Sequence, residues 1–263
     1  MIADFHNDFI TSDNYREVLT KYKNAENIVV AAVYKGRRSF EECFALASII
    51  NAEKCDKIRL AFEDFSFDEN PETLERLLDL DPFYVTLTWN GDCNLGGGAG
   101  SLSGLTQKGR DVIRLLNERN VFVDLAHLGV NSFYEALSLA DKVVCSHTAF
   151  SSVNEHKRNL SDDQLEALNG RGVKIGLAFY PYFLNGTARA DVSDVFRHID
   201  YFVGRFGADN LCIGTDFYGC EVYPEGMEDY SFERLLTEKL YAAGYTEDAV
   251  NKILYNNLCG IIP

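Results

Sequence analysis

Histidine and acidic residues recur at the ends of short apolar runs in this chain of 263 residues. Three of its five histidines and three carboxylates occupy such positions, namely His6, Asp8, Glu63, His127, His147 and Asp216. A lone histidine after a strand is more often a packed residue than a ligand, so the repetition carries the argument. Imidazole and carboxylate groups suit zinc, or another divalent first-row ion such as manganese or iron. The residue types therefore favour a metal site capable of hydrolysis.

The spacing of these residues suggests how ions would be held. His6 and Asp8 are two residues apart, so on a strand they point to the same side and could give two ligands to one ion. His127 and His147 come from consecutive apolar runs and could hold a second ion. Glu63 lies between the two pairs in the sequence and could bridge them. The pattern predicts a two-metal site.

Eight short apolar, β-branched runs are typical of strands buried on both faces of a parallel sheet. They cover 2–7, 27–34, 58–64, 83–88, 121–126, 142–147, 173–179 and 211–215. Amphipathic helical patterns fill the gaps, at 14–23, 39–52, 71–80, 105–119, 131–140, 161–170, 192–206 and 231–243, with one more at 246–258. This strict alternation predicts an α/β architecture.

The distribution of the candidate ligands selects one α/β fold. In a (β/α)8 TIM barrel, the active site is assembled from the C-terminal ends of all the strands. Here the candidate residues come from both ends of the chain, which favours a closed barrel over an open doubly wound sheet. No linker or low-complexity tract interrupts the sequence, so we expect residues 1–263 to form a single (β/α)8 barrel domain.

Composition restricts the partners and the compartment. The net charge of −15 argues against nucleic acid or an anionic membrane as partner, because both require a basic face. The seven cysteines are odd in number and form no CxxC pair, which favours reduced core thiols. The first residues lack a basic segment followed by an apolar one, and no apolar run approaches the roughly 18 residues of a membrane span. We therefore expect a cytoplasmic protein that acts on a small molecule.

Three other features have simpler interpretations. The glycine-rich segment 95–101 lacks the pattern of a phosphate-binding or dinucleotide-binding loop, so we expect a mobile loop over the mouth of the site. His198 lies within a helical pattern, where helix packing is the expected role. Asp124 precedes His127 by three residues and is expected to support the site rather than bind metal.

Ordered motifs along nearly the whole chain resemble the membrane (renal) dipeptidase family, peptidase family M19 of the amidohydrolase superfamily. They are His6-Asn7-Asp8, Leu87-Thr88-Trp89-Asn90, Gly104-Leu105-Thr106-Gln107-Lys108-Gly109, Val123-Asp124-Leu125-Ala126-His127, Ser146-His147, Arg158-Asn159-Leu160-Ser161-Asp162-Asp163, Ile213-Gly214-Thr215-Asp216-Phe217 and Leu254-Tyr255-Asn256-Asn257. No single tripeptide among them is specific, but the ordered set is.

The resemblance implies a zinc-dependent dipeptidase with a role for each candidate residue. His6 and Asp8 would hold one zinc ion, and His127 and His147 the other, with Glu63 bridging. Asp216 would handle the proton of the attacking water, and Arg158 would bind the free carboxylate of a dipeptide, including one with a D-residue at its C-terminal position. A hydroxide between two such ions is a nucleophile at neutral pH.

The chain departs from the family pattern at Trp89, where better-known dipeptidases have a histidine thought to contact the substrate's carbonyl oxygen. An indole donates one hydrogen bond but carries no positive charge, which weakens or reshapes stabilisation of the oxyanion. Two alternatives therefore stay open: a metallohydrolase for another small amide, lactam or ester, and a non-catalytic metal-binding relative. The segment after the first strand is also shorter than in secreted members, which leaves open the homodimer usual in the family.

Overall fold

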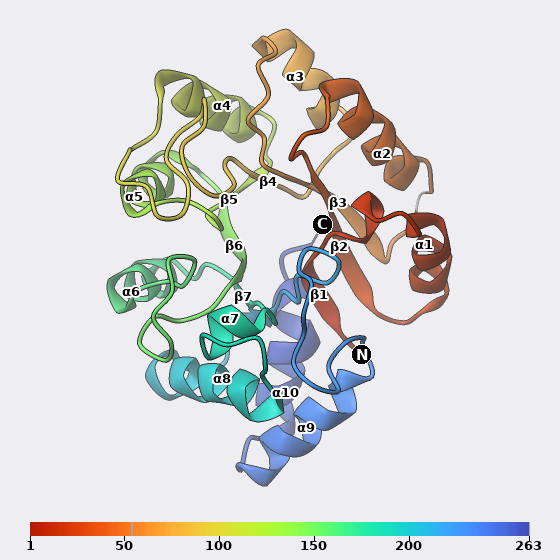
Figure 1. The fold of residues 1–263 in the computed structure, drawn as a ribbon, viewed down its shortest axis with the longest axis vertical. Helices are drawn as coiled ribbons and strands as arrows, with labels where there is room; N and C mark the ends of the chain where they lie inside the picture. The colour runs from red at the N-terminus through yellow and green to blue at the C-terminus, as the bar shows by residue number, and fades with distance from the viewer. Residues whose placement is uncertain (54, 263) are drawn as a thin grey trace. The chain divides into compact units, whose positions relative to one another are not determined.

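A computed structural model describes residues 1–53 and 55–262 and confirms the barrel. Eight parallel strands follow one another in chain order and close into a barrel (Figure 1). The strands are β1 (Ala3–Asn7), β2 (Ile28–Tyr34), β3 (Ile58–Glu63), β4 (Tyr84–Thr86), β5 (Phe122–Asp124), β6 (Val143–Thr148), β7 (Ile175–Leu177) and β8 (Leu211–Ile213). Each strand lies inside a predicted run or extends at most one residue beyond it. The agreement arises because strands buried on both faces leave continuous apolar runs in the sequence.

The predicted helices are also present. They are α1 (Tyr15–Asn24), α2 (Phe40–Glu53), α3 (Pro71–Leu78), α4 (Gln107–Glu118), α5 (Val130–Leu139), α6 (Asp162–Gly170), α8 (Val192–Phe206) and α9 (Phe232–Ala242). The last predicted helix forms as α10 (Glu247–Asn251), the π-helical turn η2 (Lys252–Asn256) and α11 (Asn257–Cys259). Two short elements were not predicted, the 3-10 turn η1 (Phe9–Thr11) and helix α7 (Pro181–Leu184).

Local signals explain where the helices begin. The Thr106 side chain accepts a hydrogen bond from the backbone of Gly109 at the start of α4, and Ser161 forms a capping box with Gln164 at the start of α6. Such caps satisfy backbone N–H groups that have no partner inside the helix. In α4 the buried residues are Gly109, Val112, Ile113 and Leu116, which share one face of the helix.

The chain divides into two compact units. Unit 1 comprises residues 1–7, 24–29 and 145–263. In it β6, β7 and β8 pair side by side, and β8 also pairs with β1, where Asp4 lies opposite Ile213. Gly176 and Gly214 face the backbone carbonyl of Ser146 so closely that a Cβ would lie 1.9 and 2.0 Å from it. These glycines therefore allow close backbone approach in this part of the sheet.

Unit 2 comprises residues 8–23 and 30–144. In it β3, β4 and β5 pair in parallel, with Thr86 opposite Asp124 at the end of the ladder. Helices α2, α4 and α5 lie on the outer side of these strands (Figure 1). All seven cysteines of the chain are free. None of the helices in the described residues has the length and apolar character needed to cross a bilayer.

His198 of α8 belongs to the core, as predicted. It is fully buried; the Phe150 backbone N–H donates to its Nδ1 at 3.2 Å, and its Nε2 lies 3.0 Å from the carbonyl oxygen of Leu184. This arrangement requires the neutral tautomer with the proton on Nε2. Burial accordingly lowers the pKa of His198 from 6.5 to about 4.

The neutral state of His198 predicts a pH-dependent stability. Between pH 6.5 and about 4 the unfolded chain binds a proton on this histidine that the folded chain does not bind, so the free energy of unfolding falls as the pH falls. The loss amounts to about 3 kcal/mol at most. Urea denaturation of wild type and His198→Gln measures it, because the glutamine does not titrate. The stability difference between the two should shrink from pH 7 to pH 4; a constant difference would contradict the prediction.

Candidate metal centre

Unit 1 brings together three of the predicted site residues, His6, His147 and Asp216. The rings of His6 and His147 lie 3.8 Å apart between centroids, and both side chains are buried. His6 Nε2 is 4.0 Å from Asp216 Oδ1. The ligand atoms of His6 lie within 4.8 Å of those of His147 and of those of Asp216. Two imidazoles and a carboxylate thus converge in one small buried region.

The backbone conformation of Asp216 and a side-chain contact of His147 hold these two groups in place. Asp216 follows β8 in a left-handed conformation, with φ 61°, and its N–H donates to the carbonyl of His6 at 3.1 Å. His147 lies within β6, and its Nδ1 is 2.8 Å from the hydroxyl of Ser146. A left-handed conformation in a non-glycine residue is strained and is often found at functional sites.

The carboxylate of Asp4, two residues before His6, is a hydrogen-bonding hub beneath this cluster. It is fully buried and accepts from the N–H and hydroxyl of Thr215 at 2.8 and 2.7 Å and from the Tyr230 hydroxyl at 2.6 Å. Asn7 Nδ2 donates both to Asp4 and to Tyr230. Burial raises the pKa of Asp4, while the hydrogen bonds from Tyr230, Thr215 and Asn7 lower it. The hub joins β1 to the segment that carries Asp216.

Unit 2 brings together Glu63 and His127. His127 Nε2 lies 2.9 Å from Glu63 Oε1, and both side chains are buried. Glu63 ends β3, whereas His127 lies three residues beyond β5 with a left-handed backbone, φ 65°. Two ligands of the same zinc ion, each about 2 Å from it, lie roughly 3 Å from one another, so the His127–Glu63 separation suits a shared ion. Asp8 is also buried and lies directly after β1, at the start of the turn η1.

Trp89 lies beside His127 and is 41% exposed. Its indole is nearly parallel to the imidazole of His127, at 26° and 6.0 Å between centroids, and lies 5.4 Å from the ring of Tyr34. Burial raises the pKa of Tyr34, and the charges of Glu63, Asp64 and Asp8 raise it further. Tyr34 is therefore neutral at physiological pH.

The glycine-rich segment 95–101 differs from the mobile loop that we expected. Residues 95–99 are buried, and Gly98 N–H donates to the carbonyl of Gly91 at 2.7 Å. Isolated bridges join Asn90 to Ala99 and Gly98 to Leu128, next to Trp89 and His127 respectively. A Cβ on Gly98 would lie 2.0 Å from the carbonyl oxygen of Trp89. Glycine is needed for close backbone packing here, and the segment supports the site residues.

Arg158 is buried against the candidate ligand His147. Its Nη2 donates to the carbonyl of His147 at 3.3 Å, and its guanidinium carbon lies 5.4 Å from the centre of the Phe183 ring. The Thr148 hydroxyl donates to the Arg158 carbonyl at 2.9 Å. An arginine at a helix start would ordinarily be exposed, whereas only 6% of Arg158 is accessible.

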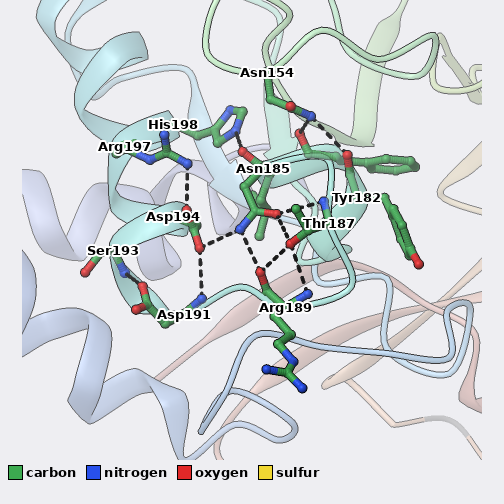
Figure 2. Close-up of polar contacts among 12 residues, drawn as sticks. Asn154, Tyr182, Asn185, Thr187, Arg189, Asp191, Ser193, Asp194, Arg197 and His198 are labelled. Carbon is green, nitrogen blue, oxygen red and sulfur yellow. Dashed lines mark hydrogen bonds and ion pairs between the residues drawn. The ribbon is translucent and has the colours of Figure 1, made fainter.

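Two asparagines of the segment before α6 hold Phe183 of helix α7 in position. Asn154 Nδ2 donates to the carbonyls of Tyr182 and Phe183, both at 3.0 Å, and Asn159 Nδ2 also donates to the carbonyl of Phe183. Figure 2 shows the loop continuing through Asn185, whose amide donates to the Arg189 carbonyl and to Asp194 of α8. The residues around Arg158 are thus held in place by hydrogen bonds from side chains, most of them to backbone carbonyls.

The chemistry of these groups fits divalent metal ions. Unit 1 supplies imidazole and carboxylate donors within 4.8 Å of one another, and unit 2 supplies a second imidazole–carboxylate pair. Buried charges and imidazoles without compensation would be costly, and metal coordination is one of the ways in which proteins compensate them. Nitrogen and oxygen donors of this kind suit zinc and its first-row neighbours.

The model of the membrane dipeptidase family, peptidase family M19, matches residues 6–263. The chain belongs to this family. An uncharacterized dipeptidase of Schizosaccharomyces pombe is 30% identical over 210 residues, which cover 75% of this chain and 50% of that protein. The chain spans little more than half the length of the curated relatives it matches, 58% and 50% in two cases.

Solved structures of M19 proteins share the fold. A dipeptidase of the family superposes with a TM-score of 0.85 at 22% identity, covering 99% of this chain and 97% of the other. A metallopeptidase from Rhodobacter sphaeroides, bound to a phosphinate mimic of L-Ala-D-Ala, superposes with a TM-score of 0.83 at 20% identity, covering 99% and 97%. Both likenesses extend over the whole barrel.

The sequence patterns did not reveal the residues that support the candidate metal centre. Asp4 was read as part of an apolar run, and Tyr230 lies 226 residues away from it in the sequence. The one available signal was the acidic residue inside an otherwise apolar strand, which must find hydrogen-bond donors when buried.

Removing the Tyr230 hydroxyl should weaken the Asp4 hub. In Tyr230→Phe the buried carboxylate loses a donor at 2.6 Å, so the free energy of unfolding should fall by about 1.5–3 kcal/mol. Chemical denaturation measures the change. The matched control is Tyr245→Phe, which removes a hydroxyl that donates to the exposed Asp200 and should cost little. Equal effects of the two variants would argue against the hub.

A methyl group at position 98 should disrupt the packing under Trp89. We expect Gly98→Ala to lower the free energy of unfolding by about 1–3 kcal/mol, because its Cβ would meet the Trp89 carbonyl at 2.0 Å. Gly170→Ala is the control, since nothing lies within 4 Å of a Cβ there. Denaturation midpoints measure both. A tolerated Gly98→Ala would show that the segment can move away, as a mobile loop would.

Proposed function

We propose that this chain is a metal-dependent dipeptidase that hydrolyses the peptide bond of small dipeptides. The observation that carries the proposal is that His6 of unit 1 lies close both to His147 and to Asp216. Membership of the M19 metallopeptidase family supports the same activity. An imidazole pair beside a carboxylate supplies both ligands for a metal ion and a group able to move protons.

We assign five residues as the ligands of two zinc ions. His6 and Asp8 would hold one ion, His127 and His147 the other, with Glu63 between them. The His6 and His147 rings lie 3.8 Å apart between centroids, close enough for the two side chains to serve neighbouring ions. The 2.9 Å approach of His127 to Glu63 supports their sharing one ion.

The residues then divide the hydrolysis between them. When bound, the ions would supply a hydroxide nucleophile at neutral pH and polarise the scissile carbonyl. Asp216, 4.0 Å from His6, would accept the proton of the attacking water and return it to the leaving amine. Its left-handed backbone and the Asp4 hub orient this carboxylate before substrate arrives, so no reorganisation is needed during the reaction.

Arg158 and Trp89 would bind the substrate. The Arg158 guanidinium, buried beside His147, can pair with the C-terminal carboxylate of a dipeptide, a group that a planar fork recognises well. The Rhodobacter sphaeroides relative was solved with a mimic of L-Ala-D-Ala, and we extend acceptance of a D-residue at the C-terminal position to this chain. Trp89 cannot supply positive charge near the carbonyl.

The identity of Trp89 favours a second candidate function. Without a cationic side chain at this position, stabilisation of a peptide oxyanion must come from the remaining groups. A more reactive carbonyl, such as that of a lactam, an ester or an activated amide, places a smaller demand on such stabilisation. A metallohydrolase for one of these substrates is the alternative.

Metal analysis combined with a dipeptide panel tests the proposal. We expect about two divalent ions per chain and release of amino acids from dipeptides with L- or D-residues at the second position. Asp216→Asn should keep its metal while kcat falls by about 10²–10⁴-fold, since it removes the proton-transfer group. The matched control Asp56→Asn changes an exposed carboxylate in a turn and should keep full activity.

Four outcomes would count against the assignment. Fewer than two ions per chain would contradict the shared Glu63. Full activity in Asp216→Asn would remove its proton-transfer role. Turnover of lactams or esters with no amino acid released from any dipeptide would favour the alternative hydrolase, and turnover of neither would favour a non-catalytic metal-binding protein.

A further inference from the structure

Trp89, the only tryptophan of the chain, presents a large apolar ring to solvent in unit 2. Its side chain is 41% exposed, whereas most other large apolar side chains near the strand ends are buried. Tyr34 lies next to it, 5.4 Å between ring centroids, and is itself half-buried. The indole and the phenol ring thus lie side by side, partly open to solvent and next to the candidate ligand His127.

The position of this surface relates it to the candidate metal centre. The indole lies nearly parallel to the imidazole of His127, 6.0 Å away, and His127 in turn contacts Glu63. A substrate whose reacting carbonyl lies near His127 would therefore place neighbouring atoms against the indole. Both ring neighbours of the indole lie within the roughly 4.5–7 Å typical of aromatic contacts, and 41% of the Trp89 side chain stays exposed for a ligand.

The backbone beneath the indole is fixed. The carbonyl of Trp89 packs against Gly98 so tightly that only glycine fits, and Asn90 forms a bridge with Ala99. A rigid aromatic side chain on an immobile backbone loses little conformational freedom when a ligand binds. The surface is thus built before the substrate arrives.

We propose that Trp89 and Tyr34 form an apolar platform that selects substrates with a large apolar or aromatic side chain. This inference rests on the proposed dipeptidase function and narrows its substrate class. The apolar side chain packs on the indole and is removed from water, which favours it over glycine or alanine at the same position. Because the platform carries no charge, acidic and basic side chains gain nothing from it.

Kinetics on matched dipeptides test the selection. We compare kcat/KM for dipeptides with glycine, alanine, leucine or phenylalanine, varied at each of the two positions in turn. Wild type should favour leucine or phenylalanine over glycine by about 10–200-fold at one position, the range that apolar pockets achieve. In Trp89→Ala this ratio should fall at least fivefold, and Trp89→Phe should retain part of it.

A control and two outcomes complete this test. Leu102→Ala removes another exposed apolar side chain, 86% accessible, and should leave the ratio unchanged. Equal kcat/KM for all side chains at both positions would overturn the platform while leaving the dipeptidase function intact. Failure to hydrolyse any dipeptide would overturn the proposed function, and this inference with it.

The single tryptophan gives a second readout that does not depend on turnover. Zinc-loaded Asp216→Asn is titrated with leucyl-leucine or with glycylglycine while the emission of Trp89 is recorded. We expect leucyl-leucine to shift the emission to shorter wavelength, because the ligand side chain removes water from the indole, and glycylglycine to leave it unchanged. The same response to both dipeptides, or to neither, would contradict the platform.

Discussion

A buried carboxylate must find hydrogen-bond donors, and in this molecule Asp4 finds them in residues that follow the last strand of the barrel. The N–H and hydroxyl of Thr215 and the hydroxyl of Tyr230 all point to it. Leaving such a group unpaired would cost several kcal/mol, so the need to satisfy it determines how β1 meets β8. His6 follows Asp4 by two residues and Asp216 follows Thr215, so the same contacts determine where both candidate site residues lie.

The same arrangement occurs in the other unit. Asp124 at the end of β5 is fully buried and accepts from the hydroxyl of Thr86 on the preceding strand at 2.6 Å. Its other oxygen accepts from the N–H of Ala126, and His127 follows with a left-handed backbone. Each unit thus pairs a buried aspartate with a threonine close in sequence to a candidate site residue. The strain of the left-handed residue, about 1–3 kcal/mol, is held by these bonds.

The sequence predicted the barrel because buried parallel strands and amphipathic helices each leave a periodic pattern along the chain. It also singled out His6, His127, His147 and Asp216, since polar residues directly after such strands are few. Their roles as ligands and proton carrier stay predictions. Supporting contacts were beyond the reach of local patterns, because Tyr230 reaches Asp4 across 226 residues. The glycine-rich segment was misjudged for a related reason.

Glycine-rich sequence has two physical meanings that local reasoning does not separate. A segment such as 95–101 can be mobile because glycine is permissive, or rigid because only glycine lets backbones approach closely. The deciding facts are tertiary: a Cβ on Gly98 would meet the Trp89 carbonyl, and one on Gly109 would lie 2.0 Å from the carbonyl of Leu95. The segment is therefore an anchor for the residues around His127.

This anchoring bears on how the proposed enzyme would use its binding energy. A side chain resting on the Trp89 indole makes the same contact before and during the reaction, so that contact lowers KM without raising kcat. A cationic group at the same position would interact most strongly with the developing oxyanion and would raise kcat. A tryptophan beside His127 therefore stabilises the bound substrate as much as the transition state. We expect such an enzyme to be selective for its substrate and to have a modest kcat.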